Sequence, residues 1–457
     1  MDISKTLNIG RIELSNFRGL AECKVNLDPK LTVFVAENGR GKTAILDGIA
    51  AAIGYVVDGI AATRQATGFY SDDVRLIRKD GGEMLPVLPT SFSVDGHVFG
   101  QDVRWTRLLS KYGSRPRTST KESKSVRRLA EDIRGKVIGN QSVESRDDLI
   151  LPLVAYYGTG RLWGDSRLTK WRSDSASRQN DRLAGYVDCL SSQSSFKLTR
   201  AWYESKWREA GDPRFKTEGK NTLPLISAIR AATSTVLEPT EWSGLNWNAT
   251  YNTLEIEHPQ FGVLPMSSLS DGVRTMLALV VDVARRCATL NPQLGEDAAQ
   301  RTPGVLLIDE VDMHLHPRWQ QRVTDLLRRA FPSLQIILST HSPHVLSTVD
   351  KSSIRVIRLE DGIAHVETPE FQTRGVESAD VLSTIMGVDP IPKVEEASWL
   401  REYRGLIEDS LATSERALSL RAMLEKHFGS NHPVILDADR LIRFQEFRLK
   451  KKTSENS

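Results

Sequence analysis

The chain has 457 residues, with 61 Lys and Arg against 58 Asp and Glu, so its formal net charge is only +3. A total this close to zero excludes a generally polycationic protein of the histone type. Hydrophobic residues at 40% and charged residues at 26% indicate a globular protein and exclude wholesale disorder. The length suffices for two or three domains, or for one elaborated α/β domain.

The three cysteines, Cys23, Cys189 and Cys287, are far apart, and none belongs to a CxxC pair. The sequence therefore predicts neither a disulfide framework nor a thiolate zinc site, and it favours a reducing compartment. The first residues lack the apolar stretch of a secretory signal, and the longest apolar run, at residues 49–57, is too short to span a bilayer. We expect a cytoplasmic protein.

In chain order, the first predicted elements are strands. Residues 9–35 alternate between apolar and polar positions and end in the apolar run Leu31–Val35. A glycine-rich turn follows, and then an apolar helix over residues 44–57. The Asp95-Gly96 pair lies between two β-prone runs, which predicts a hairpin turn.

The middle of the chain is more polar. Residues 110–128 are basic and poor in apolar groups, which predicts a mobile loop. The elements expected beyond it are a strand at 149–157, helices within 183–236, strands within 247–257, a helix from Val273 to Val283, apolar strands at 305–308 and 336–338, and an amphipathic helical segment at 395–428.

The segment AENGRGKT, residues 36–43, lies between a predicted strand and a predicted helix. This is the arrangement of a phosphate-binding loop, whose glycines let backbone N–H groups point at phosphate oxygens. Lys42 can reach the terminal phosphates, and Thr43 can ligate magnesium. The first glycine of the usual GxxxxGK[ST] pattern is replaced by Ala36. The predicted contacts of the nucleotide are Asn38, Gly39, Arg40, Gly41, Lys42, Thr43 and Ala44.

A second segment, VLLIDE at residues 305–310, is an apolar strand that ends in two acids. Asp309 is placed to hold magnesium, and Glu310 is placed to polarise an attacking water. Acids end many buried strands, so the segment gains its meaning from its place after the phosphate-binding loop.

Two further segments can present donors to phosphate. In SLSDGVRTMLAL, residues 268–279, Ser270 and Gly272 lie at a helix start, although the segment taken by itself favours an ordinary N-cap with Asp271 in the first turn. In IILSTHSPHVL, residues 336–346, His341 follows a buried strand and can donate to a γ-phosphate. A structural histidine is the alternative.

The order of these four segments resembles the ATP-binding cassette (ABC-type) heads of the structural-maintenance-of-chromosomes, RecF and overcoming-lysogenisation-defect ATPases. The resemblance implies an α/β fold, a mixed sheet with a phosphate-binding loop and flanking helices, and hydrolysis of ATP with Mg²⁺. Lys42, Glu310 and His341 would be catalytic, and Ser270 would complete the ATP site of a second subunit in a homodimer or larger homo-oligomer. In the opening IGRIELSNFRGL, Arg18 matches the family's arginine near the nucleotide.

The sequence also departs from these families. The signature reads LSDGV, where transporters carry LSGGQ, so Asp271 and Val273 differ. The insert between the two halves of the head lacks heptads and a CxxC hook, which excludes long coiled-coil arms. In MHLHP, residues 313–317, His314 and His316 are too few for a metal site and favour a subunit contact.

The segment AYYGTGRLWG, residues 155–164, and the short C-terminal region are similar to the ATPase subunits of Septu anti-phage systems. That similarity implies a role in anti-phage defence with a separate HNH-type nuclease. A RecF-like DNA-binding ATPase of replication or repair is the alternative.

Autonomous nuclease activity has one weak signal. Residues 434–436 precede Asp437-Ala438-Asp439, which superficially matches the DxD of a toprim nuclease of the overcoming-lysogenisation-defect type. Little chain is available for a toprim sheet, so we favour a loop that leads into a basic helix at 440–452. Nuclease chemistry is then expected in a partner.

The small net charge conceals three basic segments. Residues 104–128, 161–182 and 440–452 carry +8, +3 and +5, so the rest of the chain carries −13. Such segments can be solvated loops, or they can contact nucleic acid.

The sequence thus predicts five regions. They are an N-terminal half of the ATPase head (1–110), a basic mobile loop (111–148), a mostly helical insert (149–245), a C-terminal half of the head (246–370) and a helical C-terminal region that binds a partner (371–457).

Overall fold

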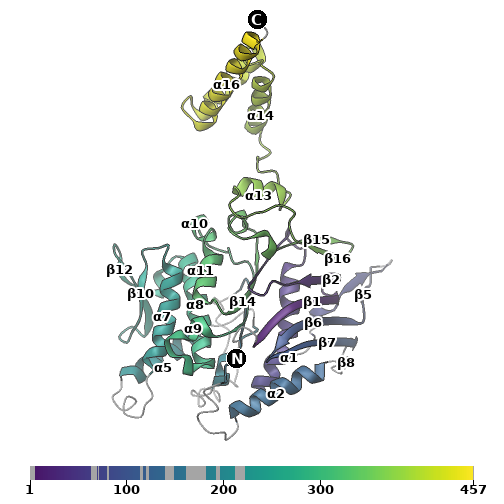
Figure 1. Cartoon of the computed structure of the whole chain (residues 1–457), viewed down its shortest axis with the longest axis vertical. Helices are drawn as coiled ribbons and strands as arrows, with labels where there is room; N and C mark the ends of the chain where they lie inside the picture. Colours follow the sequence, from purple (N-terminus) through teal and green to yellow (C-terminus); the bar gives the residue numbers. More distant parts are fainter. Residues whose placement is uncertain are drawn as a thin grey trace. The chain divides into compact units, whose positions relative to one another are not determined.

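The chain divides into two units in the computed structural model (Figure 1). The first unit is Met1–Val381 and the second is Leu382–Ser457, whereas we expected the C-terminal region to begin at residue 371. The structure describes residues 6–62, 69, 71–79, 82–113, 117–119, 123–138, 149–160, 182–191, 196–211 and 222–455.

The first unit is built on a mixed sheet that has eleven strands among the described residues. In spatial order these are β8 (Arg117–Ser119), β7 (Gln101–Lys111), β6 (Thr90–Val98), β1 (Leu7–Phe17), β2 (Leu20–Asn26), β16 (Ile363–Glu367), β15 (Ile354–Glu360), β3 (Leu31–Val35), β14 (Leu334–Thr340), β13 (Gly304–Ile308) and β9 (Leu153–Tyr157). Smaller sheets pair β4 (Leu76–Arg78) with β5 (Met84–Pro86), and β10 (Ser243–Asn248) with β11 (Thr253–His258) and β12 (Gly262–Pro265). The mixed sheet with flanking helices confirms the predicted fold class.

One part of this sheet is parallel and carries the strands that precede the predicted site. β15, β3, β14, β13 and β9 run in the same direction. Every residue of β3, β9, β13 and β14 is buried, as expected when both faces of a parallel sheet are covered. The carboxyl ends of β3, β13 and β14 therefore lie together at one edge of the sheet.

Helix α1 (Lys42–Ala61) packs against strands of this sheet. The indole N–H of Trp105 on β7 donates to the carbonyl of Ala52 on α1 at 3.1 Å. Gly59 admits helix α2 (Lys124–Ile138), because a Cβ there would lie 2.5 Å from the Cβ of Ala130. By length and composition α1 could cross a membrane, and it is longer than the apolar run noted in the sequence. However, 78% of its apolar window is buried inside the protein, as in a core helix.

Helix α8 (Asp271–Leu290) is the centre of a second helical group. It contacts α7 (Leu223–Leu237), α5 (Phe196–Gly211), the short helix η4 (Arg182–Tyr186) and strand β9. The described residues between 183 and 236 are thus mainly helical, as predicted. The shorter helices described in this unit are η2 (Ser71–Asp73), η5 (Met266–Ser268), η6 (Pro292–Asp297), α9 (Ala298–Arg301), α10 (Pro317–Gln320), α11 (Val323–Ala330), α12 (Pro343–Leu346) and η7 (Lys351–Ser353). Helix α13 (Ser378–Thr384) spans the boundary between the two units.

The hairpin predicted at Asp95-Gly96 is wrong. Both residues lie inside the continuous strand β6, and the chain turns at Phe99-Gly100 instead. A Cβ at Gly96 would lie 2.6 Å from the carbonyl oxygen of Asn8 on β1. The glycine therefore serves a close approach of two strands at an irregularity in their pairing, not a turn.

The loop predicted for residues 110–128 is also wrong in part. Residues 117–119 form β8, and helix α2 begins at Lys124. Val126, Ala130 and Ile133 are buried on one face of α2, a helical spacing that the basic residues between them obscure.

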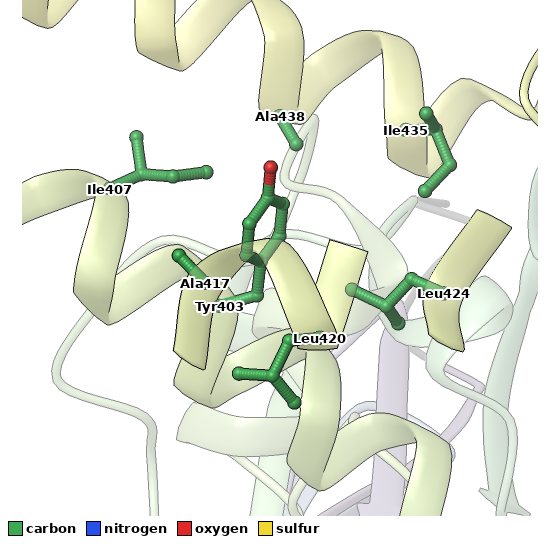
Figure 2. Packing of buried hydrophobic residues seen from close by; sticks show 7 residues of the cluster. All are labelled: Tyr403, Ile407, Ala417, Leu420, Leu424, Ile435 and Ala438. Carbon is green, nitrogen blue, oxygen red and sulfur yellow. The ribbon is translucent and has the colours of Figure 1, made fainter. Parts of the chain in front are cut away.

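The second unit is a group of three helices with a core of its own (Figure 2). These are α14 (Glu395–Glu408), α15 (Glu415–Phe428) and α16 (Pro433–Glu455). The segment expected as one amphipathic stretch at 395–428 is two helices, because Ser414 caps α15 by accepting from the N–H of Ala417 at 3.2 Å. The core residues are Tyr403, Ile407, Ala417, Leu420, Leu424, Ile435 and Ala438.

The DxD signal falls inside helix α16, which begins at Pro433. Asp439 pairs with Arg421 of α15, and Asp437 pairs with Arg440 one turn along. Ala438 between them is buried in the helical core. A toprim site needs a strand before the DxD, so the toprim interpretation of this segment is wrong, and so is the loop that we expected before the basic helix.

Candidate active site

The segment between β3 and α1 has the backbone that a phosphate-binding loop requires. Gly39 and Gly41 have φ angles of +75° and +93°, which favour glycine. A Cβ at Gly41 would also lie 2.9 Å from the Leu20 side chain. Ala36 is not among the residues with positive φ, so its methyl group is accommodated and the missing first glycine does not disturb the loop.

Lys42 turns back onto this loop. Its Nζ donates to the carbonyls of Ala36 at 3.0 Å and Glu37 at 3.2 Å. Burial lowers the pKa of Lys42, while the nearby carboxylates of Asp309 and Glu310 oppose that effect. The ammonium group is held at the mouth of the loop, where incoming phosphate oxygens can replace the carbonyls as acceptors.

Thr43 and Asp309 meet across the edge of the sheet. The Thr43 hydroxyl donates to Oδ2 of Asp309 at 2.8 Å. Asp309 is only 1% exposed, and its second oxygen accepts from the hydroxyl of Ser339 on β14. A hydroxyl and a buried carboxylate at this distance are oxygen ligands of the kind that Mg²⁺ binds, together with phosphate oxygens.

Glu310 is the first residue beyond β13, and it has a left-handed backbone with φ of +47°. Its N–H donates to the Ser339 hydroxyl at 2.8 Å. Ser339 therefore fixes both acids of the pair, one through the side chain and the other through the backbone. The positive φ turns the chain so that Glu310 lines the pocket beside Lys42.

His341 follows β14 at the same edge. Asp312 positions it, since Oδ1 of Asp312 accepts from the Thr340 hydroxyl at 2.5 Å and from the His341 N–H at 3.3 Å. Burial and the charge of Lys42 lower the pKa of His341, so the ring is neutral at pH 7 and can donate from one nitrogen.

These elements enclose one cavity of about 330 Å³. The residues that line it are Arg18, Gly19, Leu20, Asn38, Gly39, Gly41, Lys42, Thr43, Ala44, Glu310, His341 and Leu359. Most of the predicted site residues thus come together, from strands that are hundreds of residues apart in the chain.

Arg18 reaches the cavity from the turn between β1 and β2. Its guanidinium pairs with Asp47 on α1 and, through Nε at 3.2 Å, with Asp73 on η2. Burial tends to lower the pKa of Arg18, but the two carboxylates outweigh burial and raise it. The arginine is therefore permanently charged and is held at the wall of the cavity.

Some predicted residues lie outside the cavity. Asp309 is buried beneath it, and Arg40 pairs with Glu37 and donates to the carbonyl of Leu359. Ser270 is exposed at the N-terminus of α8. Gly272 packs on the chain after the acid pair, where a Cβ would lie 2.3 Å from the His314 carbonyl oxygen.

In the MHLHP segment, His316 has a structural contact. His316 caps α10, with Nδ1 accepting from the Arg318 N–H at 3.3 Å. Within the described part of the chain, no group of three or more His, Cys, Asp or Glu could hold a metal ion.

Sequence reasoning missed several residues of this site. Leu20 and Leu359 supply apolar wall, and Ser339, Asp312 and Asp47 hold the functional side chains. Ser339 and Asp312 lie within or beside the quoted motifs. Their place in the sequence could therefore have marked them as candidate site residues. Nothing in the sequence points to Leu359.

A protein-family model described as "AAA domain, putative AbiEii toxin, Type IV TA system" matches residues 31–347. A second model, described as "AAA ATPase domain", matches residues 8–52. The first match spans well over half of the chain and includes every predicted site residue except Arg18, which the second includes.

The chain is similar to the Retron Vc95 probable ATPase of Vibrio cholerae serotype O1 biovar El Tor, with 24% identity over 93% of this chain and 90% of that protein. It is 24% identical to the Retron Ec83 probable ATPase of Escherichia coli, over 94% of this chain and 86% of that protein. The Septu protein PtuA of Bacillus thuringiensis is 25% identical over 28% of this chain and 33% of that protein. The Septu likeness expected from the sequence is therefore partial, whereas the retron ATPases align throughout.

Among solved structures, the SMC head bound to the C-terminal winged-helix domain of ScpA aligns with a TM-score of 0.48 and 17% identity, over 79% of this chain and 97% of that one.

Proposed function

Because the chain belongs to the AAA-domain family whose model spans residues 31–347, we propose that it is the ATPase subunit of an anti-phage defence complex. The chain is an ABC-type ATPase. The proposal adds that two copies bind ATP between them, that ATP controls a separate HNH-type nuclease, and that the complex acts in the cytoplasm. The full-length likeness to two retron ATPases and the partial likeness to Septu PtuA support a role in defence.

The geometry supports a division of work within one copy. The loop N–H groups and Lys42 would bind the phosphates, and Thr43 with Asp309 would hold Mg²⁺, which neutralises phosphate charge when bound. Glu310 would accept a proton from the attacking water as its oxygen bonds to the γ-phosphorus and the bond to the β,γ-bridging oxygen breaks. His341 would donate a hydrogen bond to the γ-phosphate.

One observation carries the proposal of a second copy: Ser270 is exposed and absent from the cavity wall, although it begins a 20-residue helix. A helix N-terminus favours anions, so a phosphate bound by another copy would complete the arrangement. The ATP site is then shared between two chains.

Mixing two inactive variants tests this sharing. Lys42→Ala disables the phosphate-binding loop, and Ser270→Arg blocks the signature that serves the other copy. If sites are shared in a symmetric dimer, the mixture recovers roughly a quarter of wild-type hydrolysis, because half the dimers are mixed and each has one intact site. A mixture as inactive as its components would contradict the shared site.

The second unit is our candidate for nuclease docking, since it has a core of its own. Co-expression of the chain with each neighbouring gene tests the partner. An HNH-type nuclease that copurifies with the full chain but not with a variant lacking residues 382–457 would support it. Genes of a replication operon in that neighbourhood would favour the RecF-like alternative.

Nucleic-acid contact is proposed for the basic segments. Within residues 104–128, Arg104 pairs with Asp95 and Glu13, and Arg107 is buried over Tyr55, so these two serve the fold. Lys111, Lys124 and Arg128 are exposed. Arg115, Lys121 and residues 161–181 lie outside the described residues.

Charge reversal tests this contact. Changing Lys111, Lys124 and Arg128 to Glu should flatten the dependence of DNA affinity on salt, because fewer counterions are released. An unchanged slope would mean that these residues form a solvated surface and do not contact DNA.

A further inference from the structure

Strand β9 carries two adjacent tyrosines, in the segment AYYGTG that the ATP site does not use. Tyr156 and Tyr157 are 3% and 1% exposed. Side chains alternate along a strand, so the two rings lie on opposite faces of the sheet. β9 is the outermost strand beside β13, and the N–H of Tyr156 donates to the Cys189 carbonyl at 2.7 Å on its outer side.

Tyr156 does not line the nucleotide cavity itself, but it is connected to the cavity wall through Asp47. Its hydroxyl is hydrogen-bonded to Asp47, the same carboxylate that pairs with Arg18 at the cavity wall. Any movement of Arg18 toward a bound nucleotide would therefore change the charge that faces the Tyr156 hydroxyl.

Tyr157 faces helix α8. Its hydroxyl donates to Oδ2 of Asp282 at 2.6 Å, and its backbone carbonyl accepts from the Asp309 N–H at 2.8 Å. One residue thus contacts the proposed magnesium ligand through its backbone and helix α8 through its side chain.

Asp282 is held from several sides. Its carboxylate also accepts from the Thr199 hydroxyl on α5 at 2.5 Å, from Arg285 at 2.7 Å and from Arg286 at 2.8 Å. Arg286 in turn donates to the Gly185 and Val187 carbonyls, both at 2.9 Å. A buried charge with this many partners tolerates little displacement, so a shift of Tyr157 would move α8 as a unit.

We propose that Tyr156 and Tyr157 are positioning residues that couple occupation of the nucleotide cavity to the placement of α8 and its N-terminal Ser270. The inference rests on the proposed sharing of the ATP site, because Ser270 serves the second copy. The contacts run from Arg18 and Asp47 to Tyr156, along β9 to Tyr157, and from there to Asp282. The parallel pairing of β9 with β13 connects the same strand to Asp309. A buried tyrosine that only fills space would not connect the nucleotide cavity to the placement of α8.

Removal of one hydroxyl tests the coupling. Tyr157→Phe retains the ring and the carbonyl but loses the donor to Asp282. We expect kcat for ATP hydrolysis to fall roughly tenfold or more, with KM changed by less than about threefold, because a positioning defect acts on the chemical step. Tyr156→Phe should act in the same direction, and it provides a second variant if Tyr157→Phe does not fold.

A matched control separates coupling from packing. Tyr186→Phe removes the hydroxyl of another fully buried tyrosine, which donates to the Pro152 carbonyl at 2.7 Å. It should leave kcat within about twofold of wild type while lowering the denaturation midpoint as Tyr157→Phe does. Equal kcat losses in all the variants would overturn the inference.

A double-mutant cycle completes the test. If Tyr157 acts through α8, Tyr157→Phe adds little to the kcat loss of Ser270→Ala, whereas independent effects multiply. Multiplying effects would overturn the coupling and leave the shared ATP site intact. Failure of the proposed function itself appears elsewhere, as unrecovered hydrolysis in the mixture of Lys42→Ala and Ser270→Arg.

Discussion

Thr43 and Asp309 share a hydrogen bond of 2.8 Å although 266 residues separate them in the chain. The bond joins the start of α1 to the end of β13, and it orients a hydroxyl and a carboxylate toward one point. Ser339 holds the other oxygen of Asp309. Contacts within the protein therefore hold both predicted magnesium ligands in place.

Ser339→Ala should loosen the position of Asp309, one of the predicted magnesium ligands. The change removes a donor to Asp309 and an acceptor for the N–H of Glu310, so both acids lose a fixed position. We expect the magnesium concentration for half-maximal hydrolysis to rise about 10- to 100-fold, the usual effect of losing a partner of a metal ligand. Ser347→Ala, which removes a hydroxyl bonded to the His344 carbonyl, is the control. Equal magnesium requirements in both variants would contradict this role.

Glu310→Gln should separate binding from hydrolysis. The amide fits the same space but cannot accept the proton of water, so we expect kcat to fall about 10²- to 10⁴-fold while ATP affinity stays close to wild type. Hydrolysis under single-turnover conditions and equilibrium binding of labelled ATP provide the two measurements. Glu370→Gln, at an exposed position, should match wild type in both. Normal turnover in Glu310→Gln would contradict the assignment of Glu310 as the general base.

Gly272→Ala should destabilise the start of α8. The new methyl group would lie 2.3 Å from the His314 carbonyl oxygen, so the helix must shift, at a cost of about 1–3 kcal/mol in the free energy of unfolding. Gly135→Ala is the matched control, because a Cβ there has nothing within 4 Å. That change should stabilise helix α2 by up to about 1 kcal/mol. Urea denaturation of both variants measures the difference, and equal shifts would refute the close contact.

The cysteines should be unreactive in the folded protein. Burial raises the pKa of Cys23, Cys189 and Cys287 to about 12 in each case, so almost none of the thiol is ionised at pH 8. A thiol reagent at pH 8 should label none of them in native protein and all three in urea. Ser419→Cys, on the exposed side of α15, provides a thiol that reacts at once. Rapid native labelling of more than that thiol would show that the core opens.

Leu424→Ala should unfold the second unit alone. Leu424 is fully buried in its small core, and truncation of a buried leucine costs about 2–5 kcal/mol. Leu418→Ala is the control, because this leucine on the same helix is 58% exposed. We expect rapid proteolysis within residues 382–457 of Leu424→Ala only, and wild-type ATP hydrolysis in both. Loss of hydrolysis in Leu424→Ala would mean that the ATPase depends on this unit.

The sequence predicted the site better than it predicted the surroundings. Lys42, Asp309 and His341 each follow a fully buried, mostly apolar strand, and such strands leave few alternatives for where their ends lie. The same property hides Ser339, because β14 is buried on both faces and lacks the alternation that would assign a side chain to a face. Only the three-dimensional arrangement shows that it touches both acids.

Two other errors have local causes. Asp95-Gly96 has the composition of a tight turn, but the glycine meets a requirement imposed by β1, which is distant in sequence. Charge dominates the composition of helix α2 and predicts a loop, although Val126, Ala130 and Ile133 follow a helical spacing. At Gly96 long-range packing overrides the local signal, whereas in α2 the local helical signal is present but obscured by charged residues.

The position of β3 in the sheet has a consequence for synthesis. This apolar strand lies between β14 and β15. Both are translated about 300 residues after it. At ordinary elongation rates, β3 therefore stays unpaired for about 15–60 s before these strands are made. Throughout that interval the nascent chain carries an apolar segment that can pair with other chains. Co-expression with chaperones, which cover apolar segments during that interval, should therefore raise the yield of folded protein.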